Sequence, residues 1–246
     1  MKVSFDTTGE VLVATGGAHG IGAALVAAYA QAGGTSVVLD ILPVDQRESA
    51  GLERVEHEVV DVADRAAVHA AVERVMARHG RIDALVAGAA IQPRVDVLDT
   101  DAETWQRTID INLNGVVWVC QAVARHMVAA RKGAIVAFAS GLARTGHAQA
   151  AAYSATKSGI VTFITSLAAE LAAHRVRANV IYPGVIDTPQ FRKANPPGPE
   201  LEHWLETTGV GAAEDVVGPL LFLLSDAATM TGSVLTRDRV YRKEDS

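Results

Sequence analysis

The stretch TGGAHGIG, residues 15–22, follows the apolar run VLVA and precedes a segment of small residues with helical character. Its three glycines, Gly16, Gly20 and Gly22, form the pattern G-x-x-x-G-x-G. Glycine loses more backbone entropy on folding than any other residue, so such a cluster needs a structural or chemical reason. One reason is a tight turn, and the other is a phosphate group that rests against bare backbone. The stretch alone leaves both open.

Strand-like runs alternate with helical patterns along the whole chain, which predicts a parallel sheet with helices on both faces. We therefore expect one domain over residues 1–246, an α/β, Rossmann-like, doubly wound parallel sheet of about seven strands. The predicted strands are 10–15, 36–40, 57–62, 82–90, 133–140, 177–183 and 233–236, and the predicted helices are 20–34, 64–80, 101–131 (a pair), 152–174 and 214–226. The irregular stretch 188–209 is predicted to be a substrate-loop insertion.

Composition excludes several classes of protein. Of 246 residues 49% are hydrophobic, enough for a large core, yet no apolar run approaches the roughly 18 residues of a membrane span. No secretory signal is visible, and the single cysteine, Cys120, cannot form an internal disulfide, so we expect a cytoplasmic protein. The net charge of −6 argues against a nucleic-acid partner.

The surroundings of the glycines favour a dinucleotide site. The stretch lies between a predicted strand and a predicted helix, and Asp40 ends the next strand, about 20 residues farther on, where a carboxylate hydrogen-bonds the adenosine ribose. The positive end of the helix stabilises the pyrophosphate. Because a carboxylate at Asp40 repels a 2′-phosphate, NAD is preferred over NADP, although His19 offers NADP a competing contact.

A second pattern, YSATK, carries Tyr153 and Lys157 four residues apart, on one face of a predicted helix. A free phenol has a pKa of about 10, and a neighbouring ammonium lowers it toward the pH at which a general base works. Ser140 ends the preceding strand, and Asn112 lies at the opening of a helix. Each has an ordinary alternative, a turn residue for Ser140 and an N-cap for Asn112, so the hypothesis depends on their meeting at the carboxyl edge of the sheet.

With these motifs the chain resembles the short-chain dehydrogenases/reductases over residues 10–236. The resemblance rests on TGGAHGIG, Asp40, the pair Asp61-Val62, Asn112, Ser140, YSATK and PGVIDTP (183–189). It implies a reversible hydride transfer between a nicotinamide coenzyme and a secondary alcohol or ketone. It also implies a homo-oligomer, a tetramer or dimer, in which apolar faces of helices 116–128 and 160–171 pack between subunits.

The resemblance assigns the individual roles. It implies Tyr153 as general acid/base, Lys157 as the group that lowers its pKa and binds the nicotinamide ribose, Ser140 as the group that orients the substrate oxygen, and Asn112 as the holder of a water that links Lys157 to solvent. The coenzyme-binding set is Gly16, Gly20, Ile21, Gly22, Asp40, Asp61, Val62, Ala89, Tyr153, Lys157, Ile186 and Thr188. No metal site is predicted.

Two segments depart from the family pattern. Ala87-Gly88-Ala89-Ala90 replaces the usual Asn-Asn-Ala-Gly, which removes side-chain hydrogen bonds that steady the central sheet. Asp238-Arg239-Val240, followed by the charged tail 241–246, replaces Asp-Gly-Gly in a segment that supports subunit packing and the pocket floor.

The substrate pocket is expected around 92–94, 141–149, 182–185 and 188–209. Its candidate polar contacts are Gln92, Arg94, Arg144, His147, Gln149, Tyr182 and Arg192, which together favour a polar substrate such as a sugar or hydroxy acid over a steroid-like one. Two alternatives remain, an NADPH-dependent ketone reductase and a non-catalytic dinucleotide-binding module on the same fold. The retained tyrosine and lysine favour an enzyme.

Overall fold

A computed structural model of the chain describes residues 3–44 and 53–240. Within these ranges one sheet has the strand order β3-β2-β1-β4-β5-β6-β7, and every neighbouring pair is parallel. The strands are β1 (Val11–Thr15), β2 (Thr35–Asp40), β3 (Val55–Val59), β4 (Ala84–Ala87), β5 (Gly133–Phe138), β6 (Val176–Tyr182) and β7 (Val234–Thr236). The predicted parallel α/β sheet is confirmed.

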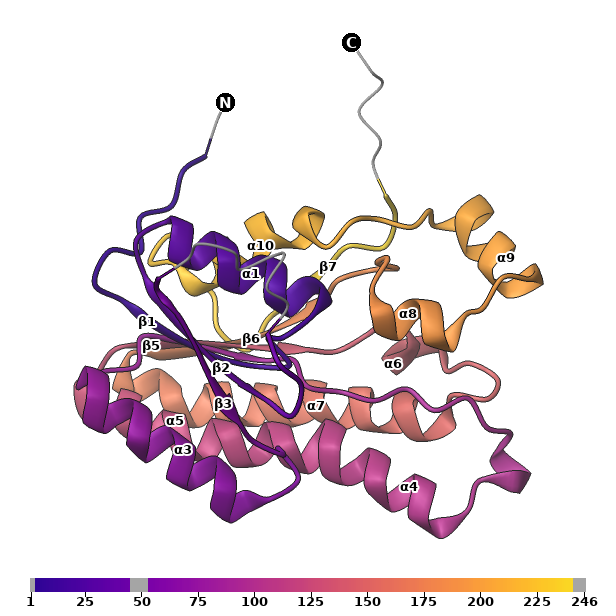
Figure 1. The fold of residues 1–246 in the computed structure, drawn as a ribbon, viewed down its shortest axis with the longest axis horizontal. Coiled ribbons are helices and arrows are strands. Elements are labelled where there is room, and N and C mark those ends of the chain that lie inside the picture. Colours follow the sequence, from indigo (N-terminus) through magenta and orange to yellow (C-terminus); the bar gives the residue numbers. More distant parts are fainter. Residues whose placement is uncertain (1–2, 45–52, 241–246) are drawn as a thin grey trace.

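Helices cover both faces of this sheet. Figure 1 shows α1 and α10 on one face and α3, α5 and α7 on the other. The helices are α1 (Gly20–Gln31), α3 (Arg65–His79), α4 (Ala102–Ile109), α5 (Gly115–Ala130), α6 (Leu142–Thr145), α7 (Ala151–Leu171), α8 (Pro189–Ala194), α9 (Pro199–Thr207) and α10 (Glu214–Leu224), with shorter turns at Val97–Asp99 and Ala172–His174.

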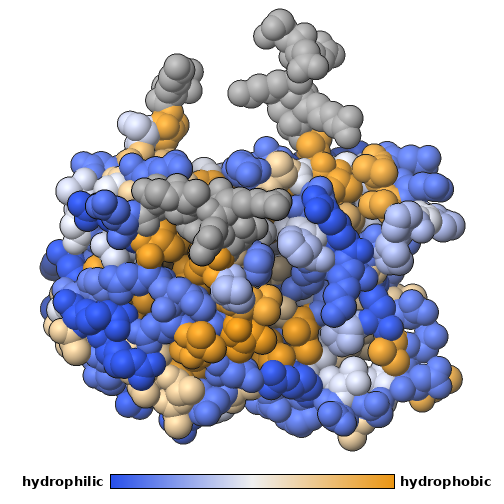
Figure 2. Space-filling view, viewed as in Figure 1, coloured by the Kyte–Doolittle hydropathy of each residue, from blue (hydrophilic) through white to orange (hydrophobic). Residues whose placement is uncertain are grey.

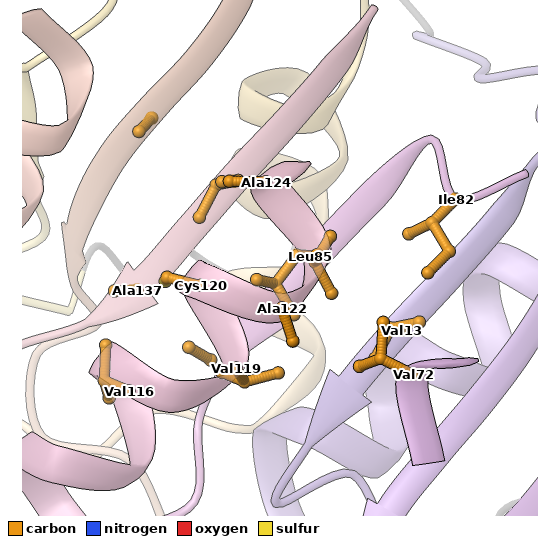
Figure 3. Packing of buried hydrophobic residues seen from close by; sticks show 14 of the residues in the cluster. Val13, Val72, Ile82, Leu85, Val116, Val119, Cys120, Ala122, Ala124 and Ala137 are labelled. Carbon is orange, nitrogen blue, oxygen red and sulfur yellow. The ribbon is translucent and has the colours of Figure 1, made fainter. Parts of the chain in front are cut away.

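Apolar side chains fill both interfaces between sheet and helices. Successive residues of a strand point to opposite faces, so Leu12 packs in the cluster beside α1 and Val13 in the cluster beside α3 and α5. Figure 3 shows Val13 and Leu85 of the sheet near Val72 of α3 and Val119 of α5. Each such side chain contributes about 1.5–3 kcal/mol when fully buried. The core therefore holds the strand ends in fixed positions.

Three expected elements differ from the observed ones. The strand predicted at 57–62 is β3, which ends at Val59, so the Asp61-Val62 pair lies just beyond it. The irregular stretch 188–209 forms α8 and α9; Thr188 caps α8 by accepting the Phe191 N–H at 3.1 Å. The helix pair predicted at 101–131 is one continuous helical path with a π turn at Asp110–Asn114.

The visible surface is mainly polar. Figure 2 shows blue residues over most of one face and a smaller apolar area beside β3, the edge strand on which Val59 is exposed. Over residues 3–44 and 53–240, no helix has the length and apolar character to cross a membrane.

Apolar residues of α5 and α7 that were expected to pack between subunits lie largely against the core of the same chain, and the oligomer stays a prediction.

Candidate active site

The carboxyl ends of parallel strands meet at one edge of a sheet, and the predicted site residues gather there. The glycine stretch follows β1, Asp40 ends β2, Ala89 follows β4 and Ser140 follows β5. Tyr153 and Lys157 lie in the first turns of α7. The topology therefore brings together segments that are far apart in the sequence.

Close backbone approach explains the glycines. Gly16 and Gly20 have φ angles of +68° and +58°, the left-handed region that favours glycine. A methyl group added at Gly16 would lie 2.6 Å from the backbone nitrogen of Ala89, and one added at Gly22 would collide with the carbonyl oxygen of Gly16. The turn thus packs against the loop after β4 and closes on the first turn of α1.

The first turn of α1 suits a bound phosphate. It contains no acidic residue, and His19 at its N-cap position makes no side-chain capping hydrogen bond. The positive helix end and its backbone N–H groups are therefore available to an anion. The residues present fit the pyrophosphate of a dinucleotide.

Asp40 is held by the same turn. Its carboxylate accepts the Ala18 N–H at 3.2 Å and the Leu42 N–H at 3.0 Å. Each carboxylate oxygen keeps further acceptor capacity, so ribose hydroxyl groups can bind in addition. This fixed acid stands where the adenosine ribose of a dinucleotide is expected.

The remaining candidate coenzyme residues take different positions. Thr188 lies against Gly20, where an added methyl group would be 3.0 Å from its Cγ2 atom. Asp61 accepts from Ala63 N–H at 3.0 Å and from Arg107 at 2.9 Å. Val62 and Ile186 are buried, and Ile21 packs on the core. Thr188 thus joins the glycine turn to α8. Val62 and Ile21, in contrast, pack in the hydrophobic core in addition to their predicted contact with the coenzyme.

Tyr153 and Lys157 form a buried pair whose pKa values differ from expectation. Lys157 Nζ lies 5.5 Å from the centre of the Tyr153 ring. Burial raises the pKa of Tyr153 to about 12, while the side chain of Ser140 and the positive charge of Arg94 oppose this rise. Burial also lowers the pKa of Lys157 to about 8. Loss of hydration is the largest influence on both groups and raises the pKa of Tyr153, so the role expected of Lys157 in lowering that pKa stays a prediction.

Lys157 has a defined partner. Its ammonium donates to the carbonyl oxygen of Phe138, at the end of β5, over 2.8 Å. The lysine is only 2% exposed. This hydrogen bond joins α7 to β5 and fixes the ammonium of Lys157, one helical turn after Tyr153.

Ser140 and Asn112 organise the neighbouring loops. Ser140 Oγ accepts the Leu142 N–H at 3.2 Å. Asn112, in the π turn rather than at a helix opening, accepts the Ile91 N–H and donates to the Ile91 carbonyl, both at 2.8 Å. Asn112 also donates to Thr156 Oγ1 at 3.3 Å, so it fastens the loop after β4 to α7. Its water relay stays a prediction.

Thr15 and Thr156 also support the site, although neither was predicted from the sequence. Thr15 Oγ1 accepts from the backbone N–H groups of Gly88 and Ala89 at 3.2 and 3.4 Å. These bonds steady the loop where the family pattern has asparagine, so the Ala87–Ala90 departure does not leave it unsupported. The signal for Thr15 was its position at the end of β1, directly before the glycines.

The C-terminal departure also has defined contacts. Asp238 accepts from Arg144 at 3.1 Å, and the Val240 N–H donates to the Thr208 carbonyl at 2.8 Å. The segment is thereby tied to the rim of the site on two sides. The tail 241–246 lies outside the described residues.

The polar substrate candidates divide into two groups. Arg94 and His147 lie together, with Arg94 Nη1 2.9 Å from His147 Nδ1. Arg144, in contrast, pairs with Asp238 and lies over the ring of Tyr182, and the exposed Arg192 pairs with Asp187. Arg94 is the candidate whose charge acts on Tyr153.

Comparison with known proteins agrees with this geometry. The family model described as short chain dehydrogenase matches residues 10–198. D-threitol dehydrogenase of Mycolicibacterium smegmatis is 37% identical, with 98% of this chain and 96% of that protein covered. Cis-4-hydroxycyclohexanecarboxylate dehydrogenase of Sinomonas cyclohexanicum is 35% identical, with 94% and 96% covered.

Solved structures show the same fold. The NADPH-dependent 3-quinuclidinone reductase of Rhodotorula rubra matches with a TM-score of 0.85 and 30% identity, covering 95% of this chain and 91% of that one. The family model and the relatives cover the glycine turn and the tyrosine–lysine pair together. The chain therefore belongs to the short-chain dehydrogenase/reductase family of nicotinamide-dependent oxidoreductases, which act on alcohols and ketones.

Proposed function

We propose that this chain is an NAD-dependent dehydrogenase/reductase that interconverts a polar secondary alcohol and its ketone. The observation that carries the proposal is the buried Tyr153–Lys157 pair beside Ser140, at the sheet edge that also holds the glycine turn and Asp40. A non-catalytic binding module has no use for a buried lysine beside a buried phenol, because burying either group without a task costs stability. The arrangement favours an enzyme.

The proposed chemistry is proton transfer at the substrate oxygen. When bound, the nicotinamide supplies or accepts the hydride at the carbinol carbon. Ser140 orients the oxygen, and Tyr153 donates the proton to a carbonyl or removes it from a hydroxyl group. With its pKa raised to about 12, the phenol is protonated near neutral pH and suited to donate. Lys157, whose Nζ lies 5.5 Å from the centre of the ring, can stabilise the phenolate when Tyr153 acts as the base.

Asp40 supports NAD as the coenzyme. Two backbone N–H groups hold its carboxylate, and a negative charge fixed at that point repels a 2′-phosphate. The NADPH-dependent relative shows that the family fold also accommodates the phosphorylated coenzyme. The coenzyme choice of this chain is therefore proposed from Asp40. A cytoplasmic location is proposed from the composition, and a homo-oligomeric state is proposed from the family.

Tyr153→Phe tests the catalytic proposal. A positioned acid/base contributes about 10²–10⁴-fold to the rate, so we expect kcat to fall by about that factor while calorimetry shows nearly unchanged NAD binding. Tyr29→Phe is the control, because Tyr29 is a buried phenol that donates to Glu10 away from the site. Retained turnover in Tyr153→Phe would remove the residue from the mechanism, and absent coenzyme binding in the unmodified protein would contradict the proposed function.

A further inference from the structure

A charged cluster joins four segments beside Tyr153. Arg94 follows β4 and donates from Nη2 to Glu200 Oε1 at 2.7 Å and to Asn195 Oδ1 at 2.9 Å. His147 Nε2 lies 3.2 Å from the same Glu200 oxygen. Asn195 is the C-cap residue of α8 and Glu200 lies in the first turn of α9. The cluster therefore fastens the segment predicted to be a substrate loop to the loops after β4 and before α7.

Arg94 connects the cluster to the residues that precede α7. The Val95 N–H donates to the Gln149 carbonyl at 3.0 Å, which fixes the Arg94 loop against the residues that lead into α7. The charge of Arg94 acts on the phenol of Tyr153. Figure 1 shows α8 and α9 at the end of the molecule where α6 also lies. A substrate oxygen at Tyr153 therefore lies within the electrostatic reach of Arg94, which Glu200 contacts directly.

The charges of Arg94 and Glu200 cancel, but one donor of Arg94 has no hydrogen-bond acceptor among the described residues. The Arg94 side chain is 15% exposed and Glu200 38%, so the guanidinium is the more buried partner. Its Nε is buried and finds no acceptor among the described residues. A buried donor without a partner costs free energy, so a shift of the side chain that brings Arg94 Nε to a substrate oxygen is favoured. Because Glu200 already neutralises the cation, that acceptor need not carry a charge.

We propose that Arg94 and Glu200 set the substrate class: they favour a neutral polyhydroxylated substrate, one of whose hydroxyl oxygens accepts from Arg94, over an α-hydroxycarboxylate. This inference rests on the proposed oxidoreductase function. A substrate carboxylate would meet the like charge of Glu200 and would have to displace it from Arg94, whereas a hydroxyl group displaces no charge. Removal of the Glu200 charge leaves the guanidinium free for a carboxylate.

The test uses two substrates that differ at one end. Threitol ends in a CH₂OH group where threonate has a carboxylate. We expect the unmodified protein to have the higher kcat/KM for threitol in NAD-linked oxidation. In Glu200→Gln the ratio of kcat/KM for threonate to that for threitol should rise at least ~10-fold, because an unpaired guanidinium attracts a carboxylate. In Arg94→Gln the same ratio should fall, since Glu200 then lacks its guanidinium partner and its negative charge repels a carboxylate.

Glu202→Gln is the matched control, because Glu202 is an exposed carboxylate on the same helix, α9, and its loss should leave the ratio unchanged. An unchanged ratio in both Glu200→Gln and Arg94→Gln, with melting temperatures like that of the unmodified protein, overturns the inference. A preference of the unmodified protein for threonate or for apolar alcohols also overturns it. If no alcohol or ketone is turned over with either coenzyme, the proposed function fails as well, so the two failures are distinguishable.

Discussion

The proposed coenzyme side and the proposed substrate side of this site are shaped by different parts of the chain, the backbone on one side and side chains on the other. On the coenzyme side the backbone forms the surface. Gly16 lies so close to Ala89, and Gly22 so close to Gly16, that neither glycine could carry a side chain. On the substrate side, side chains do it: Arg94, Glu200 and their polar neighbours bridge loops that have no shared strand. A backbone site recognises a constant group such as a pyrophosphate, whereas paired side chains can change with the substrate.

This difference predicts how each side responds to substitution. A side chain added to the backbone turn must displace the main chain, which affects binding of every coenzyme. A substitution in the charged cluster changes the ratio of kcat/KM between two substrates and leaves the glycine turn intact. Two relatives are named for different substrates, a neutral polyol in one case and a carboxylate-bearing ring in the other.

Gly22→Ala gives the largest expected effect, because its methyl group would collide with the Gly16 carbonyl and open the turn. We expect NAD affinity to fall by at least about 100-fold, or about 3 kcal/mol, in calorimetric titration. Gly218→Ala is the matched control, since a methyl group at that helical position meets nothing within 4 Å. The control should bind NAD normally and gain up to about 1 kcal/mol of stability. Equal NAD affinity in both variants would contradict the division between the two sides.

Asp40→Asn is expected to have a smaller effect, confined to the choice of coenzyme. The amide keeps the shape of the side chain and removes the charge that repels a 2′-phosphate, so the NAD-to-NADP ratio of kcat/KM should fall by about tenfold, or about 1.4 kcal/mol. Asp238→Asn, which removes an exposed carboxylate at the rim, is the comparison. A ratio that stays the same in Asp40→Asn would show that another group selects the coenzyme.

The fold and the coenzyme side could be predicted from the sequence because their signals are local. Alternating runs gave all seven strands, and the glycine spacing with Asp40 marked a turn that the structure confirms at the carboxyl edge. Strand ends were less predictable: β3 stops at Val59 because pairing with β2 ends there, although the apolar pattern continues.

The substrate side was less predictable, because its contacts join residues with no sequence relation. Nothing local shows that Arg94 pairs with Glu200 or that Arg192 pairs with Asp187. The effect of burial on the pKa of Tyr153 was not predicted, for a related reason. Spacing places Lys157 near the phenol, but the loss of hydration that raises its pKa depends on how the whole edge is packed.

The last prediction concerns Lys157, which stands between the two sides, and uses the pH dependence of stability. Its pKa is about 8 when folded and about 10.4 when unfolded, so the unfolded chain binds more protons between these values and stability rises with pH there. We expect Lys157→Met to lose this contribution, up to about 1.4 kcal/mol per pH unit, because the variant has no ammonium to bury. Urea unfolding at pH 8, 9 and 10 measures it as the difference between the two proteins, which cancels other titrating groups. Loss of the Phe138 hydrogen bond shifts the curves by a constant and does not change their slopes.

Tyr153, with its pKa raised to about 12, lowers stability only above about pH 10 and lies outside this window. Parallel curves would mean that the ammonium of Lys157 is as well hydrated as in the unfolded chain, and the sheet edge would then be open to water rather than closed by the packing of α7 on β5.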